Sequence, residues 1–209
     1  MKRCIWIGKT LVLGILAGLS ISLGGTVFLA VTDKTVGALL FSVGLFCVCA
    51  FGFHLFTGKV CYVFDNDRRY ALALPVIWIG NLIGALCTGW LESITRMGPA
   101  LAEKAVAICE TKLDQTALSA FVLAFFCDIM IYIAVEGYKN IPHETGKYLA
   151  ILFGVVVFIL CGFEHCVANM YYFTIGNAWS WKAVGYLLLM TAGNAAGGIA
   201  IPVLRKLAK

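Results

Sequence analysis

Charged residues are scarce in this chain. Only 13% of its 209 residues are charged, whereas 61% are hydrophobic, and the mean hydropathy is +0.92. Soluble domains contain about 25% charged and about 45–50% apolar residues. The composition therefore excludes a soluble globular protein. It also excludes a disordered chain, which requires low hydrophobicity.

The cysteines lack the pattern of a disulfide framework or a metal site. There are nine, an odd number, and no C-x-x-C occurs. Most lie within apolar stretches, where cysteine acts as a small polarizable packing residue. A helical di-metal site needs Glu and His ligands from several helices, but the chain has one adjacent Glu-His pair, Glu164 and His165. The sequence thus predicts neither a metal nor another cofactor.

Apolar stretches of membrane-crossing length occur six times. A helix that spans a bilayer needs about 20 mostly apolar residues. Four stretches have no charged residue, and the other two carry one acid each, Asp128 and Glu164. The stretches are Thr10–Thr32, Thr35–Gly58, Tyr70–Leu91, Gln115–Val135, Tyr148–Trp181 and Ala183–Leu204. We therefore expect an all-α integral, multi-pass membrane protein of six transmembrane helices, forming a single domain over residues 1–209 in the lipid bilayer.

The net charge of +5 fits a membrane protein better than a nucleic-acid-binding one. Cytoplasmic loops carry an excess of Lys and Arg. With an even number of spans and the start of the chain inside, the basic residues on the inner side outnumber those on the outer side. Both termini are therefore predicted to be cytoplasmic, and no nucleic-acid partner is expected.

Two short motifs recur along the chain. G-N-x-x-G occurs at Gly80–Gly84 and again at Gly193–Gly197, and a Gly-Phe pair occurs at Gly52 and at Gly162. The chain thus divides into two three-span halves, approximately 9–97 and 113–208, with opposite orientations. Inverted repeats place a pathway between the halves, framed by broken helices. We expect the second and fifth helices to break at these Gly-Phe pairs, and the four-residue glycine spacing to let helices approach closely.

Ionisable residues within the apolar stretches are the first candidates for function, because burying such a group in a membrane is costly. His165 can donate a hydrogen bond or a proton to a small anion. Glu164 is expected to support the break after Gly162 by accepting backbone N–H bonds. Thr57 ends the matching motif of the first half, Asn169 lies one helical turn beyond His165, and Lys112 can attract anions toward a pore mouth.

The residues G-F-E-H-C-V-A-N-M-Y-Y-F at Gly162–Phe173 resemble the hallmark of the formate/nitrite transporter family. L-F-T at Leu55–Thr57 and the two G-N-x-x-G motifs are also similar to that family. The resemblance covers nearly the whole chain. It implies an aquaporin-like protomer in a homopentamer, in which each protomer conducts a small weak-acid anion such as formate, nitrite, hydrosulfide, acetate or lactate.

The resemblance also implies roles for individual residues. His165 corresponds to the central pore histidine, Thr57 to its loop partner and Lys112 to a vestibule lysine. An outer apolar constriction is implied at Phe41 and Phe158, and an inner one at Leu45, Leu55 and Phe56. Asp128 stands where the family usually has asparagine: ionised, it repels anions or pairs with His165; protonated, it resembles asparagine. His54 stands where the family is usually acidic.

The sequence therefore favours a channel or transporter of weak-acid anions in a bacterial cytoplasmic membrane, with permeation that depends on pH and proton transfer. An aquaporin-like channel for neutral solutes is the alternative, although no N-P-A motif is present. An intramembrane enzyme is not expected, because it requires a nucleophile, a base and an orienting group, and Cys166 beside His165 is the one candidate pair.

Overall fold

A computed structural model describes the backbone of residues 2–208 and the side chains of residues 6–208. This part of the chain is helical and contains no strand. Five helices are long and apolar enough to cross a membrane, namely α1 (Lys2–Ala30), α2 (Lys34–Phe51), α4 (Arg68–Ser93), α6 (Ala117–Asn140) and α9 (Trp181–Leu207). The other elements are α3 (Phe56–Val60), the 3-10 turn η1 (Val63–Asp65), α5 (Gly98–Leu113), α7 (Glu144–Leu160) and α8 (Cys166–Ile175).

Two non-helical segments interrupt the helices, and they have the same local structure. Gly52 and Gly162 both adopt φ of 68°, a left-handed conformation that glycine tolerates without strain. The next residue then donates its N–H to a carbonyl five residues back, from Phe53 to Val48 and from Phe163 to Phe158. The first segment separates α2 from α3, and the second separates α7 from α8.

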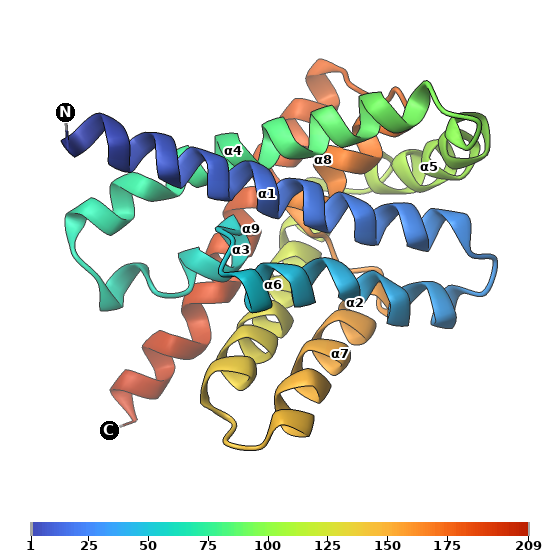
Figure 1. Cartoon of the computed structure of the whole chain (residues 1–209). Helices are drawn as coiled ribbons and strands as arrows, with labels where there is room; N and C mark the ends of the chain where they lie inside the picture. The colour runs from blue at the N-terminus through green and yellow to red at the C-terminus, as the bar shows by residue number, and fades with distance from the viewer. Residues whose placement is uncertain (1, 209) are drawn as a thin grey trace.

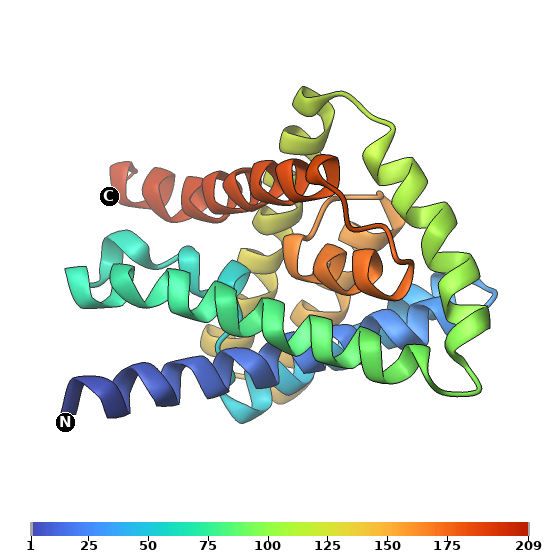
Figure 2. The same ribbon diagram turned by 90° about the horizontal axis from the view of Figure 1, so that it is seen from above.

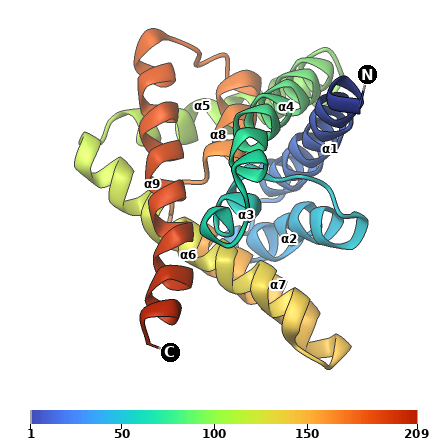
Figure 3. The ribbon, with the colours of Figure 1, turned by 90° about the vertical axis from the view of Figure 1, so that its left-hand side faces the viewer.

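The helices form a bundle in which the long helices run alongside one another (Figure 1). The start of α1 and the end of α9 lie on the same side of the molecule, which we call the terminal side (Figure 2). Seen from that side, the short helix α3 lies among the long helices rather than at the periphery (Figure 3). Both interrupted segments thus bring non-helical backbone into the interior, where freed backbone groups need protein partners.

Helix α5 was not expected from the sequence. Residues 91–115 join the third and fourth apolar stretches and are rich in polar residues, a composition that indicates a segment outside the membrane but does not show a helix. They contain a helix of 16 residues with Pro99 in its first turn, a position where the missing proline N–H costs nothing. This helix lies across the side remote from the termini (Figure 2), and it carries Lys112 in its last turn.

Glycines at the helix contacts allow the close approach that their spacing predicts. A Cβ atom at Gly18 of α1 would overlap the backbone of Asn81 in α4, and one at Gly197 of α9 would overlap the backbone of Phe125 in α6. The α1–α4 and α6–α9 pairs are therefore in backbone-to-backbone contact, the geometry that small residues permit in membrane bundles.

Candidate functional site

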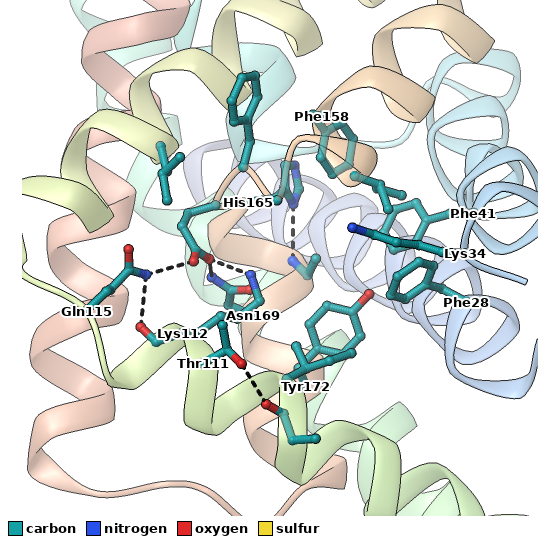
Figure 4. Close-up of a pocket in the computed structure, with 18 of the residues that line it drawn as sticks. Phe28, Lys34, Phe41, Thr111, Lys112, Gln115, Phe158, His165, Asn169 and Tyr172 are labelled. Carbon is teal, nitrogen blue, oxygen red and sulfur yellow. Dashed lines mark hydrogen bonds and ion pairs between the residues drawn. The ribbon is translucent and has the colours of Figure 1, made fainter. Parts of the chain in front are cut away.

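A cavity of about 640 Å³ opens on the side remote from the termini, and we call it the vestibule. It is lined by residues of α1, α2, α5, α6, α7 and α8 and by the segment between α7 and α8. Five predicted pathway or constriction residues that line it are labelled in Figure 4, namely Lys112, His165, Asn169, Phe158 and Phe41. The sequence thus predicted several residues that the fold brings to one cavity.

His165 lies at the inner end of the vestibule as the N-cap residue of α8. Its Nδ1 accepts a hydrogen bond from the Ala168 N–H at 3.1 Å. An acceptor nitrogen carries no proton, so the neutral ring has its proton on Nε2. That nitrogen lies 2.9 Å from Thr57 Oγ1 and donates to it. The ring is 2% exposed and stacks on Phe158 at a centroid distance of 5.7 Å. His165 is thus a neutral, oriented hydrogen-bond donor.

Two buried asparagines hold the interrupted segments in place. Asn81 Oδ1 accepts the Phe56 N–H at 2.8 Å, and its Nδ2 donates to the carbonyls of Gly14 and His54. Asn194 makes the same set of bonds in the second segment. Its Oδ1 accepts from Cys166 N and its Nδ2 donates to the carbonyls of Ala124 and Glu164.

These asparagines satisfy the backbone groups that the interruptions leave unpaired. Sequence analysis found the G-N-x-x-G motifs but assigned them to helix packing through their glycines. The asparagine between the two glycines of each motif could have revealed this role, because a buried amide requires hydrogen-bond partners.

Glu164 forms side-chain bonds rather than the expected backbone N–H bonds. Its carboxylate accepts from Lys112 Nζ at 2.5 Å, from Gln115 Nε2 at 2.9 Å and from Asn169 Nδ2 at 2.8 Å. The Lys112 and Glu164 side chains are only 14% and 3% exposed. This network joins α5 and α8 to the segment before α6 (Figure 4). Glu164 therefore supports the second interruption through side chains, and it offsets the charge of Lys112.

The two expected apolar constrictions differ in how they meet open space. Phe41 and Phe158 are buried, pack edge-to-face at 5.9 Å and border the vestibule. Leu55 borders a second, smaller cavity of about 130 Å³ on the terminal side, which we call the terminal-side pocket. Leu45 and Phe56 are buried in the apolar core and line neither cavity. His165 and Thr57 thus lie between two cavities separated by buried apolar side chains.

Asp128 does not pair with His165, which was one of the possibilities left open by the sequence. Both nitrogens of His165 are bonded to Thr57 and Ala168. Asp128 is fully buried in α6, and neither carboxylate oxygen has a hydrogen-bond partner among the described residues. Its carboxylate lies against the backbone of Gly198 and lines neither cavity. Asp128 is therefore outside the walls of both cavities.

The described side chains, those of residues 6–208, form no cluster that could hold a metal ion. No three His, Cys, Asp or Glu side chains gather there closely enough to ligate one. The polar groups of the site are instead hydrogen-bond donors and one ion pair. Such an arrangement can attract, orient and desolvate a small polar solute.

Comparison with known proteins gives a consistent result. Residues 2–207 match the family model described as "Formate/nitrite transporter". The chain is 31% identical to an uncharacterized transporter, YrhG, of Bacillus subtilis, covering 90% of this chain and 80% of the relative. It is 29% identical to the nitrite transporter NirC of Salmonella typhimurium, covering 93% and 78% of the two chains.

A solved structure described as a pentameric formate channel with formate bound has the same fold. It superposes with a TM-score of 0.81 at 24% identity, covering 97% of this chain and 96% of the other.

Proposed function

The chain belongs to the formate/nitrite transporter family, and from that premise we propose that it carries small monovalent anions of weak acids, such as formate, nitrite or hydrosulfide. It is an integral, multi-pass membrane protein that transports anions and is not an enzyme. The vestibule, His165 and the terminal-side pocket form the proposed route. The observation that best supports this route is the oriented Nε2–H of His165, which lies between the two cavities.

The proposed architecture has six spans in two inverted repeats, at about 9–97 and 113–208, within one channel domain. The matching glycine conformations and the matching bonds of Asn81 and Asn194 support it. In this arrangement α2 with α3, and α7 with α8, are the broken second and fifth spans. We further propose an aquaporin-like protomer, five of which assemble in a bacterial cytoplasmic membrane with both termini inside. Residues 1 and 209 of the proposed domain lie outside the described structure.

Desolvation is the main barrier that such a pathway must lower. An isolated anion in an apolar environment carries a large free-energy cost, whereas a neutral acid costs far less. Glu164 offsets the positive charge of Lys112. Lys34 lines the same cavity, and we propose that it also attracts anions into the vestibule. At the inner end, the solute can replace the Thr57 hydroxyl as the acceptor of the His165 Nε2–H hydrogen bond.

The state of His165 bears on the source of the proton. Protonating Nδ1 would remove the acceptor that caps α8, so the cationic ring is incompatible with the observed N-cap bond. We therefore propose that the anion takes its proton from hydronium in the solvent of the vestibule, leaving water, and that His165 donates a hydrogen bond to the passing species without carrying a positive charge. Flux then rises as pH falls, because the neutral acid becomes more abundant.

A second candidate is passage of neutral solutes. The neutral ring of His165 and the offset charge of Lys112 favour it, since the passage between the cavities bears no net charge from these groups. The aquaporin-like arrangement would then admit a solute such as glycerol without any dependence on protonation.

Flux into proteoliposomes tests both candidates. The solutes are formate, nitrite, hydrosulfide, acetate, lactate, chloride and glycerol, each at two pH values, with empty vesicles as the control. We expect faster passage of one or more weak-acid anions at the lower pH and no passage of chloride. Glycerol passage without anion passage would support the second candidate instead. Unchanged formate flux in His165→Ala would remove His165 from the mechanism.

A further inference from the structure

The terminal-side pocket has features that the transport mechanism described above does not use. It lies beyond Leu55, between α2, α3 and α6, and has a volume of about 130 Å³. Most of its wall is apolar, including Val48, Phe53 and Val135. Lys59 and Lys139 also line it. Lys59 is half-buried there, whereas Lys139 is exposed. Two lysines at one small, mostly apolar pocket give it a positive entrance that the mechanism above leaves without a role.

The proposed inverted repeat relates this pocket to the vestibule. Counted from Gly52 and Gly162, Leu55 holds the position of His165, and Lys59 holds that of Asn169. Asn169 lines the vestibule, and Lys59 lines the terminal-side pocket. The backbone therefore presents both side chains to a cavity in the same way. A polar amide on one side of the pathway is matched by a cation on the other.

Neither lysine of the pocket is neutralised by an acid. Among the described residues, the ion pairs are Lys112 with Glu164, Arg205 with Glu136, and Lys206 with Asp65. Glu136 is one turn from Lys139 on α6, but its oxygens already accept from Tyr62 and Arg205. The ammonium of Lys139 lies 3.7 Å from the centroid of the Tyr62 ring, which positions it without removing its charge. The pocket thus carries two positive charges.

We propose that the terminal-side pocket is a binding site for one small monovalent anion, which Lys59 and Lys139 attract to its wall. The proposal rests on the proposed transport function and identifies the anion as the transported species itself. At the vestibule, Lys112 is paired with Glu164, and the remaining lysine, Lys34, shares the cavity with the acid Asp114, so the two mouths differ in charge. The site therefore captures anions more strongly from the terminal side than from the vestibule side.

The first test is the concentration dependence of formate flux from each side, in vesicles of phosphatidylcholine alone so that no anionic headgroup competes. In Lys59→Gln/Lys139→Gln we expect the half-saturating formate concentration on the terminal side to rise roughly threefold to tenfold, as for loss of two partly exposed charge interactions. The value on the vestibule side stays the same. Lys147→Gln, a terminal-side lysine outside the pocket, is the matched control and leaves both values unchanged.

The second test needs no transport, because Cys49 lines the same pocket and is free. Its labelling by small thiol reagents of opposite charge is followed peptide by peptide with mass spectrometry. We expect the anionic reagent to react with Cys49 faster than the cationic one, and formate to slow the reaction of the anionic reagent. In the double variant the two reagents should react at equal rates. The thermal midpoint of the double variant is the control for misfolding. We expect it to match that of the native chain, so that a lost preference reflects the missing charges.

The outcomes separate this proposal from the function on which it rests. Equal labelling by the two reagents, or labelling that formate does not slow, overturns the anion site even if flux is normal. A clear charge preference with no flux of any anion would retain the site and overturn the transport function. An equal rise in half-saturating concentration on both sides would also contradict the proposal, because it would indicate a general loss of transport.

Discussion

At the scale of single residues, the two nitrogens of His165 have separate tasks. Nδ1 caps α8, while Nε2 points at Thr57 in the space between the cavities. The sequence indicated that this histidine is functional but could not show which nitrogen is free, because the N-cap bond depends on where α8 begins. That start is set by the interruption at Gly162.

Separating the two tasks gives the first prediction. In His165→Asn the shorter amide keeps a good N-cap but cannot reach Thr57. We expect a thermal midpoint near that of the native chain, with anion flux reduced about tenfold, the value of one lost hydrogen bond to the solute. His165→Ala loses the cap too, at about 1 kcal/mol of stability. Normal flux in His165→Asn would show that Nε2 makes no contact with the solute.

The ion pair between Lys112 and Glu164 gives the second prediction. Because Glu164 is 3% exposed, removal of Lys112 leaves a buried charge without its cation. Lys112→Gln should therefore lower the free energy of unfolding by about 3–5 kcal/mol, as for other broken buried pairs. The double variant with Glu164→Gln should recover most of that loss. Thermal unfolding in detergent compares the native chain, the two single variants and the double variant. If the loss in the double variant equalled the sum of the two single losses, Lys112 and Glu164 would not be coupled.

At the scale of elements, the interruptions were the most predictable feature and their supports the least. The Gly-Phe pairs marked the positions of both breaks, because a left-handed glycine has a local sequence signal. The roles of Asn81 and Asn194 depend on carbonyls of helices far away in the sequence, such as Gly14 and Ala124. Helix α5 was missed for a different reason. It lies across the bundle instead of through it, so its sequence lacks the long apolar run that marks a membrane span.

Helix α9 offers a third prediction, with its own internal control. A methyl group at Gly197 would overlap the carbonyl of Phe125 in α6, whereas one at Gly185 meets nothing within 4 Å. Gly197→Ala should therefore lower the free energy of unfolding by about 1–3 kcal/mol or more, as expected for overpacking. Gly185→Ala should leave it unchanged or raise it by up to about 1 kcal/mol. Equal midpoints for the two variants would contradict backbone contact between α6 and α9.

At the scale of the whole molecule, the termini and several basic residues share one side. The side that holds the start of α1 and the end of α9 also holds Arg68, Arg69, Arg205 and Lys206 at helix ends. Basic residues favour the cytoplasmic face. The sequence predicted this bias because it needs only the order of the apolar stretches.

The fourth prediction concerns that orientation. A green fluorescent protein joined to the C-terminus should fluoresce in bacterial cells, and alkaline phosphatase at the same place should be inactive. The matched control carries the phosphatase after residue 95, in the turn between α4 and α5, where it should be active because that turn lies on the opposite side. The reverse pattern of activities would place the terminal side outside the cell.

The two interruptions have the same local structure: a left-handed glycine, an asparagine-tethered segment and the start of a short helix. In the proposed inverted repeat, a solute that enters from either end meets these features in the same order. The backbone of such a path does not distinguish one direction of passage from the other. The two entrances differ at particular places: Leu55 against His165, Lys59 against Asn169, and α5, which among the described elements has no counterpart on the terminal side. Substitutions of side chains alone can therefore tune anion entry at one side without the other, while the gradients of solute and protons set the direction of net flux.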